Sequence, residues 1–190
     1  MTNEVRKILA ELRQDHKNMT LLLNMLEHEA NLIYDNEEPD YELIQDIMRY
    51  MTSYPDAVHH PKEDRLYAEV KAARPDLSAG FDRITVDHRG IAELGVKLRD
   101  ELESISSGSF VRRKTIVADA LRYVNTLRNH MQWEELDLFR RCEEMAEKGH
   151  DLMIDALLID KTDPLFGEKL QSQFDRLLKN IRKAAETGGS

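Results

Sequence analysis

The sequence is short of the residues that cross-link, bend or break a chain. Among 190 residues there are one cysteine, five prolines and eight glycines. The single cysteine, Cys142, cannot form a disulfide within the chain or supply an all-cysteine metal or iron–sulfur site. So few prolines and glycines, beside 41% hydrophobic and 33% charged residues, favour helices with charged outer faces over strands joined by tight turns. The composition therefore predicts an all-α protein.

Positive charge and long apolar runs are also scarce. The formal net charge is −9, from 27 Lys and Arg against 36 Asp and Glu, which opposes binding to the phosphate backbone of nucleic acids. The N-terminal segment, residues 1–16, carries charges throughout and lacks the apolar stretch of a signal peptide or membrane span. With the lone cysteine, which suits a reducing compartment, these features predict a cytoplasmic protein with neither a nucleic-acid nor a membrane partner.

Apolar residues follow a helical period along four segments of the chain. They recur at steps of three and four residues, which places them on one face of an amphipathic helix, in the segments 5–33, 44–73, 81–105 and 120–138. Stretches of polar turn residues separate these segments at 35–40, 74–78 and 106–109. The chain is therefore predicted to form an up-down-up-down four-helix bundle.

Two further features refine this bundle. The second segment contains Pro55 and Pro61, which lack a backbone donor, so we expect that helix to be kinked or interrupted near them. After the fourth segment come an apolar piece at 152–159 and then a last helix, which carries on one face Leu170, Phe174, Leu177 and Ile181. We therefore divide the chain into a four-helix bundle, residues 1–148, and a C-terminal helical extension, residues 149–190, that packs on the bundle.

Ionisable residues interrupt the apolar faces of all four predicted helices. They are His16, His59, Glu63, His88, His130 and Glu134. Antiparallel helices with short connections bring together residues that lie equally far from the turn. His16 and His59 each lie roughly 18 residues from the first turn, or about 27 Å of helix, and the other positions agree within the uncertainty of predicted boundaries. The six side chains are therefore predicted to meet in one layer.

Their chemistry is that of metal ligands. His59 with Glu63, and His130 with Glu134, are spaced four residues apart, so each pair shares a helix face. An isolated inward histidine is more often a hydrogen-bonded core residue, but burying four imidazoles and two carboxylates together without a metal is costly. Six ligands exceed the needs of one tetrahedral zinc ion and suit two bridged metals. Ligand type alone allows iron, manganese or zinc.

Other residues near this layer are weaker candidates. His60 is turned about 100° from His59, toward the polar face, and we interpret it as a surface residue or a neighbour of the ligands, with direct ligation in reserve. Tyr54 lies near the expected kink and could approach the metals, but we interpret it as core packing. Met131 and Trp133 are likewise interpreted as core residues rather than the lining of a small-molecule pocket.

Four short motifs, in this order and at these distances, resemble those of the hemerythrin-like, or HHE cation-binding, family. They are AspHis at 15–16, HisHisProLysGlu at 59–63, AspHis at 87–88 and HisMetGlnTrpGlu at 130–134. The motif AspProLeuPheGly at 163–167 is similar to the tail of the bacterial stand-alone type. The resemblance implies a centre of two iron ions bridged by the two glutamates, and it favours iron over manganese or zinc.

The sequence differs from the oxygen-carrying members in two places. Their third helix has a second histidine where this chain has Ala92, and their last carboxylate is an aspartate five residues after the histidine, whereas Glu134 follows His130 by four. One coordination position is therefore expected to be open to water, a small ligand, or a side chain such as His60 or Tyr54. This difference argues against reversible oxygen transport.

The expected function follows from that open position. We expect a non-haem di-iron protein that binds or reacts with O2, NO or peroxide in sensing or stress protection, and peroxide decomposition is one enzymatic activity to test. The alternative is an iron-responsive regulatory module whose metal occupancy controls a partner protein. The sequence does not identify that partner.

Overall fold

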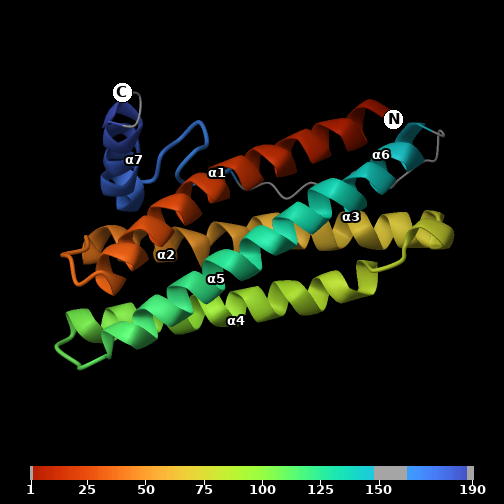
Figure 1. The fold of residues 1–190 in the computed structure, drawn as a ribbon. Helices are drawn as coiled ribbons and strands as arrows, with labels where there is room; N and C mark the ends of the chain where they lie inside the picture. The colour runs from red at the N-terminus through yellow and green to blue at the C-terminus, as the bar shows by residue number, and fades with distance from the viewer. Residues whose placement is uncertain (1, 148–161, 188–190) are drawn as a thin grey trace.

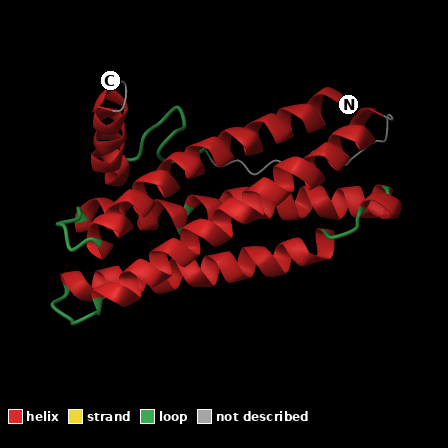
Figure 2. Cartoon of the chain, viewed as in Figure 1, coloured by secondary structure: helices red, strands yellow, loops and turns green. Residues whose placement is uncertain are grey.

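The computed structural model describes residues 2–147 and 162–187, and within these ranges it contains helices and no strand (Figure 2). The longer helices are α1 (Thr2–Tyr34), α2 (Tyr41–Met51), α3 (His60–Ala73), α4 (Phe81–Ser106), α5 (Arg113–Trp133), α6 (Phe139–Glu147) and α7 (Asp175–Thr187). Shorter helical turns are η1 (Pro55–His59), η2 (Pro75–Leu77), η3 (Glu134–Leu138) and η5 (Ser172–Phe174). The predicted all-α class is confirmed.

These elements form four roughly parallel columns, and the chain runs through successive columns in opposite directions (Figure 1). The first column is α1, the second is α2 with η1 and α3, the third is α4, and the fourth is α5 with η3 and α6. The first column packs against α2, α5 and α6, and the third packs against α2, α3 and α5. Columns that follow one another in the sequence are therefore neighbours, and the first column also packs against the fourth. The predicted four-helix bundle requires this arrangement.

A polar layer divides the apolar core of the bundle into two parts. On α1, Leu12 belongs to one part and Met19 to the other. On α4, Ile84 and Ile91 are divided in the same way. Because two turns of helix separate the members of each pair, one inward position remains between them, and histidine occupies it on both helices. The apolar parts on either side shield this layer from water.

The predicted interruption near Pro55 and Pro61 is present in the second column. Helix α2 ends at Met51, and the π-helical turn η1 begins at Pro55. There the N–H of His60 donates to the carbonyl of Pro55, five residues earlier. A second π-helical turn, η3, occurs in the fourth column and was not predicted. Such turns are wider than an α-helix and are frequent at functional sites.

The C-terminal helix contacts α2 of the bundle, and it begins later in the sequence than predicted. Helix α7 begins at Asp175, so Leu170 precedes it and is half-exposed. The reason is that the N–H of Gln171 donates to the carbonyl of Pro164 at 2.9 Å, which holds this part of the chain in a loop. Figure 1 shows α7 crossing the direction of the bundle helices, and it contacts α2. The predicted apolar piece at 152–159 lies outside the described residues, as does the proposed domain boundary after residue 148.

The AspProLeuPheGly motif anchors this extension on the second column. The carboxylate of Asp163 accepts hydrogen bonds from the N–H groups of Leu165 and Phe166, and from the hydroxyl of Tyr50 on α2 at 2.8 Å. The backbone folds back so closely that a Cβ at Gly167 would lie 2.4 Å from the Asp163 carbonyl oxygen. Only glycine fits this position without moving the backbone.

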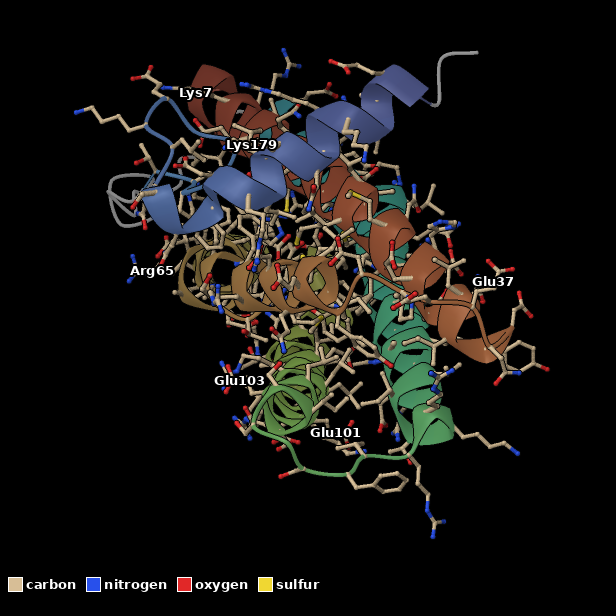
Figure 3. All side chains as sticks on the ribbon, turned by 90° about the vertical axis from the view of Figure 1, so that its left-hand side faces the viewer. Lys7, Glu37, Arg65, Glu101, Glu103 and Lys179 are labelled. Atoms are coloured by element: carbon tan, nitrogen blue, oxygen red, sulfur yellow. The ribbon has the colours of Figure 1, made fainter. Side chains whose placement is uncertain are left out.

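The outside of the bundle is polar. Figure 3 shows the charged side chains of Glu37, Arg65 and Glu103 projecting away from the helices, and all three are exposed. Within the described ranges we find no helix that combines the length and the apolar character needed to cross a membrane.

Candidate metal centre

The six predicted ligands come from all four columns and lie together inside the polar layer. None is more than 6% exposed. Their potential ligand atoms form two groups, and within each group these atoms lie within 4.8 Å of one another. One group is His16, His59 and Glu63, and the other is Glu63, His88, His130 and Glu134. The structure thus brings all six side chains together, while their binding of metal stays a prediction.

Glu63 belongs to both groups because its two oxygens face different histidines. Its Oε1 lies 3.3 Å from Nε2 of His59 and 3.5 Å from Nε2 of His16, whereas its Oε2 lies 3.4 Å from Nε2 of His88. In Glu134, Oε2 lies 3.4 Å from Nε2 of His130 and 3.5 Å from Nε2 of His16, whereas Oε1 lies 3.8 Å from Nε2 of His88. Each carboxylate can therefore reach across two neighbouring cations.

The inward atoms of this cluster are buried without hydrogen-bond partners among the described residues. This holds for Nε2 of His16, His59, His88 and His130, for both oxygens of Glu63, and for Oε2 of Glu134. Buried polar atoms nearly always have partners, and leaving them unpaired costs free energy. Imidazole nitrogens and carboxylate oxygens are also the donors that iron, manganese and zinc accept. The residues present therefore fit a pair of metal cations.

In three of the four histidines, the ring nitrogen that faces away from the cluster lies beside a carboxylate. Each Nδ1 lies 3.0 Å from a carboxylate oxygen, in the pairs His16 with Glu135, His59 with Asp15, and His88 with Asp64. An Nδ1–H that donates to a carboxylate leaves the lone pair on Nε2, which is the nitrogen that points inward. These pairs therefore fix both the ring orientation and the tautomer that a metal ligand needs.

These three carboxylates were not predicted from the sequence. Each is adjacent in sequence to a predicted ligand, which was the only available signal. Adjacency alone suggests the wrong pairing, because Asp15 precedes His16 yet bonds to His59 of the second column. Successive side chains on a helix point about 100° apart, so a neighbour in sequence more readily serves a ligand on the adjacent helix.

His130 is the exception among the four histidines. Its Nδ1 is buried and has no hydrogen-bond partner in the described part of the chain. Burial, helped by the nearby His88, lowers the pKa of His130 below its ordinary value. The ring is therefore held in its neutral form, although no carboxylate orients it.

The pKa values of the other inward groups depend strongly on the charges of their neighbours. Burial opposes protonation of His88, but Asp64, Glu134 and Glu63 outweigh it and raise its pKa to about 11. Burial also opposes ionisation of Glu63, yet the facing histidines outweigh that effect and hold its pKa well below the usual range. Without metal, His88 is therefore protonated and Glu63 is ionised.

This coupling predicts that the affinity for divalent cations rises with pH. Carboxylate neighbours raise the pKa values of His16 and His88 despite burial, so both rings are protonated near neutral pH and must release protons to bind metal. We expect the affinity for Zn²⁺ to increase about tenfold per pH unit per proton released, between about pH 6 and about pH 8. Titration calorimetry in buffers of different ionisation enthalpy measures this release, and a pH-independent affinity would contradict it.

Of the two positions predicted for His60, the place beside the ligand candidates agrees with the structure and the surface position was wrong. The residue is 4% exposed, and its ring stacks on that of His88 with the centroids 4.3 Å apart. The second column lies between α1 and α4, so His59 turns toward Asp15 on α1 while His60 turns toward His88 on α4. Burial lowers the pKa of His60 to about 4. His60 belongs to neither group of close ligand atoms.

Two tyrosines touch the cluster from outside. The hydroxyl of Tyr54 donates to Asp15 at 3.3 Å, so this residue reaches the layer through the carboxylate that holds His59. The hydroxyl of Tyr67 donates to Oε1 of Glu134 at 3.2 Å, a contact that the sequence argument did not foresee. Tyr67 thereby fixes one oxygen of Glu134 and leaves the other directed at the histidines.

Comparison with known proteins agrees with this geometry. A model of the hemerythrin HHE cation-binding domain matches residues 7–142. No curated protein and no solved structure matches the chain. The matched range contains the whole buried cluster and most of the chain, and the domain that it describes binds metal cations. The chain therefore belongs to the hemerythrin HHE cation-binding family.

Proposed function

We propose that the cluster holds two bridged iron ions and that the protein binds or reacts with O2, NO or peroxide, in sensing or in protection against oxidative or nitrosative stress. One observation carries this proposal. The inward ring nitrogens and carboxylate oxygens are buried without partners, and they form two ligand groups that share Glu63. Two cations side by side would satisfy both groups at once.

The donor set supports iron, although manganese or zinc could occupy the same ligands. Neutral imidazole and carboxylate together are typical of non-haem iron sites. Bound iron would supply one-electron redox chemistry and a site for small ligands. The chain's own residues would hold the ions at Glu63 and Glu134, while Asp15, Asp64 and Glu135 orient the histidines. The two apolar parts of the core would exclude bulk water.

The number of donors supports a small ligand rather than a closed structural site. Six side chains are fewer than two six-coordinate ions require, even when both glutamates bridge. Ala92 and the stacked His60 supply no further atom to either group. The expected partners are therefore diatomic molecules or peroxide, which are small enough to enter a buried layer.

Metal analysis and spectroscopy test this function directly. Iron-loaded protein is expected to contain about two irons per chain and to absorb in the near-ultraviolet and visible range, with changes on adding O2, NO or peroxide. His130→Ala should lose iron, whereas His28→Ala should not, because His28 is exposed and lies away from the layer. A folded, colourless protein that takes up no iron would contradict the proposal, and a spectrum unmoved by all three molecules would contradict its small-ligand part.

A second candidate is an iron-responsive module whose metal occupancy controls a partner protein. The observation that favours it is the position of the cluster between the two parts of the apolar core, where all four columns meet. Unpaired buried groups weaken the metal-free bundle at this level, so binding would tighten contacts that are distant in sequence. The stability measurement described in the Discussion tests this coupling.

A further inference from the structure

A fifth histidine, His60, lies inside the polar layer with one ring nitrogen unpaired. The residue is 4% exposed, and its Nε2 is buried without a hydrogen-bond partner among the described residues. The rings of three proposed ligands lie around it, with centroids 4.3 Å away for His88, 5.6 Å for His59 and 6.3 Å for His130. A buried polar atom without a partner costs free energy. The proposed metal ligands alone do not account for this nitrogen.

The other ring nitrogen of His60 lies beside a carboxylate, as it does in three of the proposed ligands. Its Nδ1 is 3.3 Å from Oδ1 of Asp56, four residues earlier in the second column. In His88 the corresponding distance, to Asp64, is 3.0 Å. A carboxylate in this place favours the proton on Nδ1, so the lone pair of the neutral ring is on Nε2. His60 is therefore prepared to accept a hydrogen bond, or to bind a metal, through Nε2.

Distance argues against metal binding by His60. Two nitrogens on one cation lie at most about 4 Å apart, because each metal–nitrogen bond is about 2.1 Å long. The four proposed histidine ligands each have Nε2 within 3.5 Å of Glu63 or Glu134. His60 has no such contact and belongs to neither group of ligand atoms that lie within 4.8 Å of one another. Its greater distance suits contact with a molecule bound to the metal instead.

The three molecules of the proposed function differ in what they offer to such a nitrogen. Hydrogen peroxide carries O–H groups that donate to a lone pair, whereas O2 and NO carry no hydrogen. A site with a buried polar group favours a molecule that pairs with this group over one that leaves it unpaired. Water also donates, and it would occupy the position until peroxide replaces it. The lone pair of His60 therefore distinguishes peroxide from both diatomic molecules.

A groove between α4 and α5 brings solvent toward this side of the cluster. Its volume is about 710 Å³, and its walls include Asp87 and Ile91 from α4 and His130 from α5. The ring of His130 also packs edge-on against that of His60. The groove and His60 therefore lie on either side of the same proposed ligand, and the charged walls of the groove suit a small polar molecule such as peroxide.

We propose that His60 binds peroxide at the open coordination position, where its Nε2 accepts a hydrogen bond from the O–H of the bound molecule, and that the site therefore selects peroxide over O2 and NO. The proposal rests on the proposed function, because the metal centre holds the peroxide. Asp56 keeps the proton of His60 on Nδ1, and stacking on His88 holds the ring in place. His60 thus acts on the bound molecule and not on the metal.

Replacing His60 tests the hydrogen bond. His60→Phe keeps an aromatic ring that can stack on His88 but removes the acceptor. In iron-loaded protein it should weaken the apparent affinity for peroxide, measured from the concentration dependence of the stopped-flow absorbance change, about tenfold. The iron content and the affinity for NO should equal those of the parent. His60→Gln, whose side-chain oxygen can accept, should recover part of the loss. Equal losses for peroxide and NO, or no loss in either variant, would overturn the proposal.

The carboxylates on either side of His60 provide a matched pair of variants. Asp56 and Asp64 precede and follow it by four residues, and each lies beside Nδ1 of a histidine. Asp64→Asn removes the carboxylate behind His88, so it should bind iron roughly 10- to 100-fold more weakly. Asp56→Asn should keep the iron affinity of the parent but weaken peroxide binding, because Nδ1 of His60 loses its acceptor. Equal losses of iron affinity in the two variants would identify His60 as a metal ligand and overturn the proposal.

Cadmium-loaded protein gives a measurement that does not depend on reactivity. In its NMR spectrum, spin coupling between the metal and a bound ring nitrogen should appear for the four proposed histidine ligands and not for His60, and coupling at His60 would refute the proposal. The iron-loaded protein then separates this proposal from the proposed function. A response to NO or O2 without one to peroxide would refute the role of His60 alone. An iron-loaded protein inert to all three molecules would refute the proposed function, and with it this proposal.

Discussion

Glu63→Gln is expected to remove most of the iron from both halves of the cluster. Glu63 is the one residue that both ligand groups contain, and its two oxygens face histidines on opposite sides. An amide has one weakly donating oxygen and an NH2 group that would point at a cation or its ligands. We expect iron affinity to fall by more than the roughly 10- to 100-fold that is typical for losing an outer partner of a ligand.

Two further substitutions make this a graded test. Asp15→Asn removes only the carboxylate behind His59, so it should retain iron but bind it roughly 10- to 100-fold more weakly. Glu29→Gln is the matched control, because Glu29 is a buried glutamate outside the layer whose carboxylate accepts from the N–H of Asp40. Iron analysis and circular dichroism measure occupancy and folding. Full occupancy in Glu63→Gln would refute a shared bridging role.

Iron loading is expected to raise the melting temperature by about 10 °C. The ligands come from four columns that are far apart in sequence, so the unfolded chain cannot present the same site. Free metal at about a thousand times its dissociation constant stabilises the folded state by about 4 kcal/mol. For a chain of this size each kcal/mol shifts the melting temperature by about 2–4 °C. Differential scanning calorimetry of metal-free and loaded protein measures the difference.

The local consequence of loading can be measured as well. Amide hydrogen exchange should slow most in η1 and η3, because His59 ends the first of these turns and Glu134 begins the second. His28→Ala should keep the full gain in melting temperature, while Glu63→Gln should lose most of it. Equal melting temperatures with and without iron would rule out the regulatory alternative, in which occupancy orders the bundle.

The helices and the inward positions of the six candidate ligands were predictable from the sequence because both depend on local periodicity. His16 and His88 each lie between apolar residues of the same helical face, so any bundle that buries this face also buries the histidine. The similar distances of His16 and His59 from the first turn then place them at one depth. This comparison of depth uses only the distance along each helix. Small errors in the predicted boundaries therefore did not change which residues lie in the same layer.

The errors have a different origin. His60 was assigned to the polar face by its angle from His59, but the second column has a neighbour on each side and buries both residues. Leu170 continues the apolar period of α7, yet the Gln171 N–H is bonded back to Pro164 and the helix starts later. In both cases a contact with another part of the chain overrode the local pattern.

The sequence alone therefore determined the helical class, the four columns and the six residues that meet in one layer, because the spacing of side chains along a helix states which residues share a face. Only the tertiary structure decided what lies behind each ligand: Asp15 behind His59, His60 against His88, and an open groove beside His130. These relations depend on the rotation of each helix and on which helix packs next to it. Periodicity within a single helix carries no information about either.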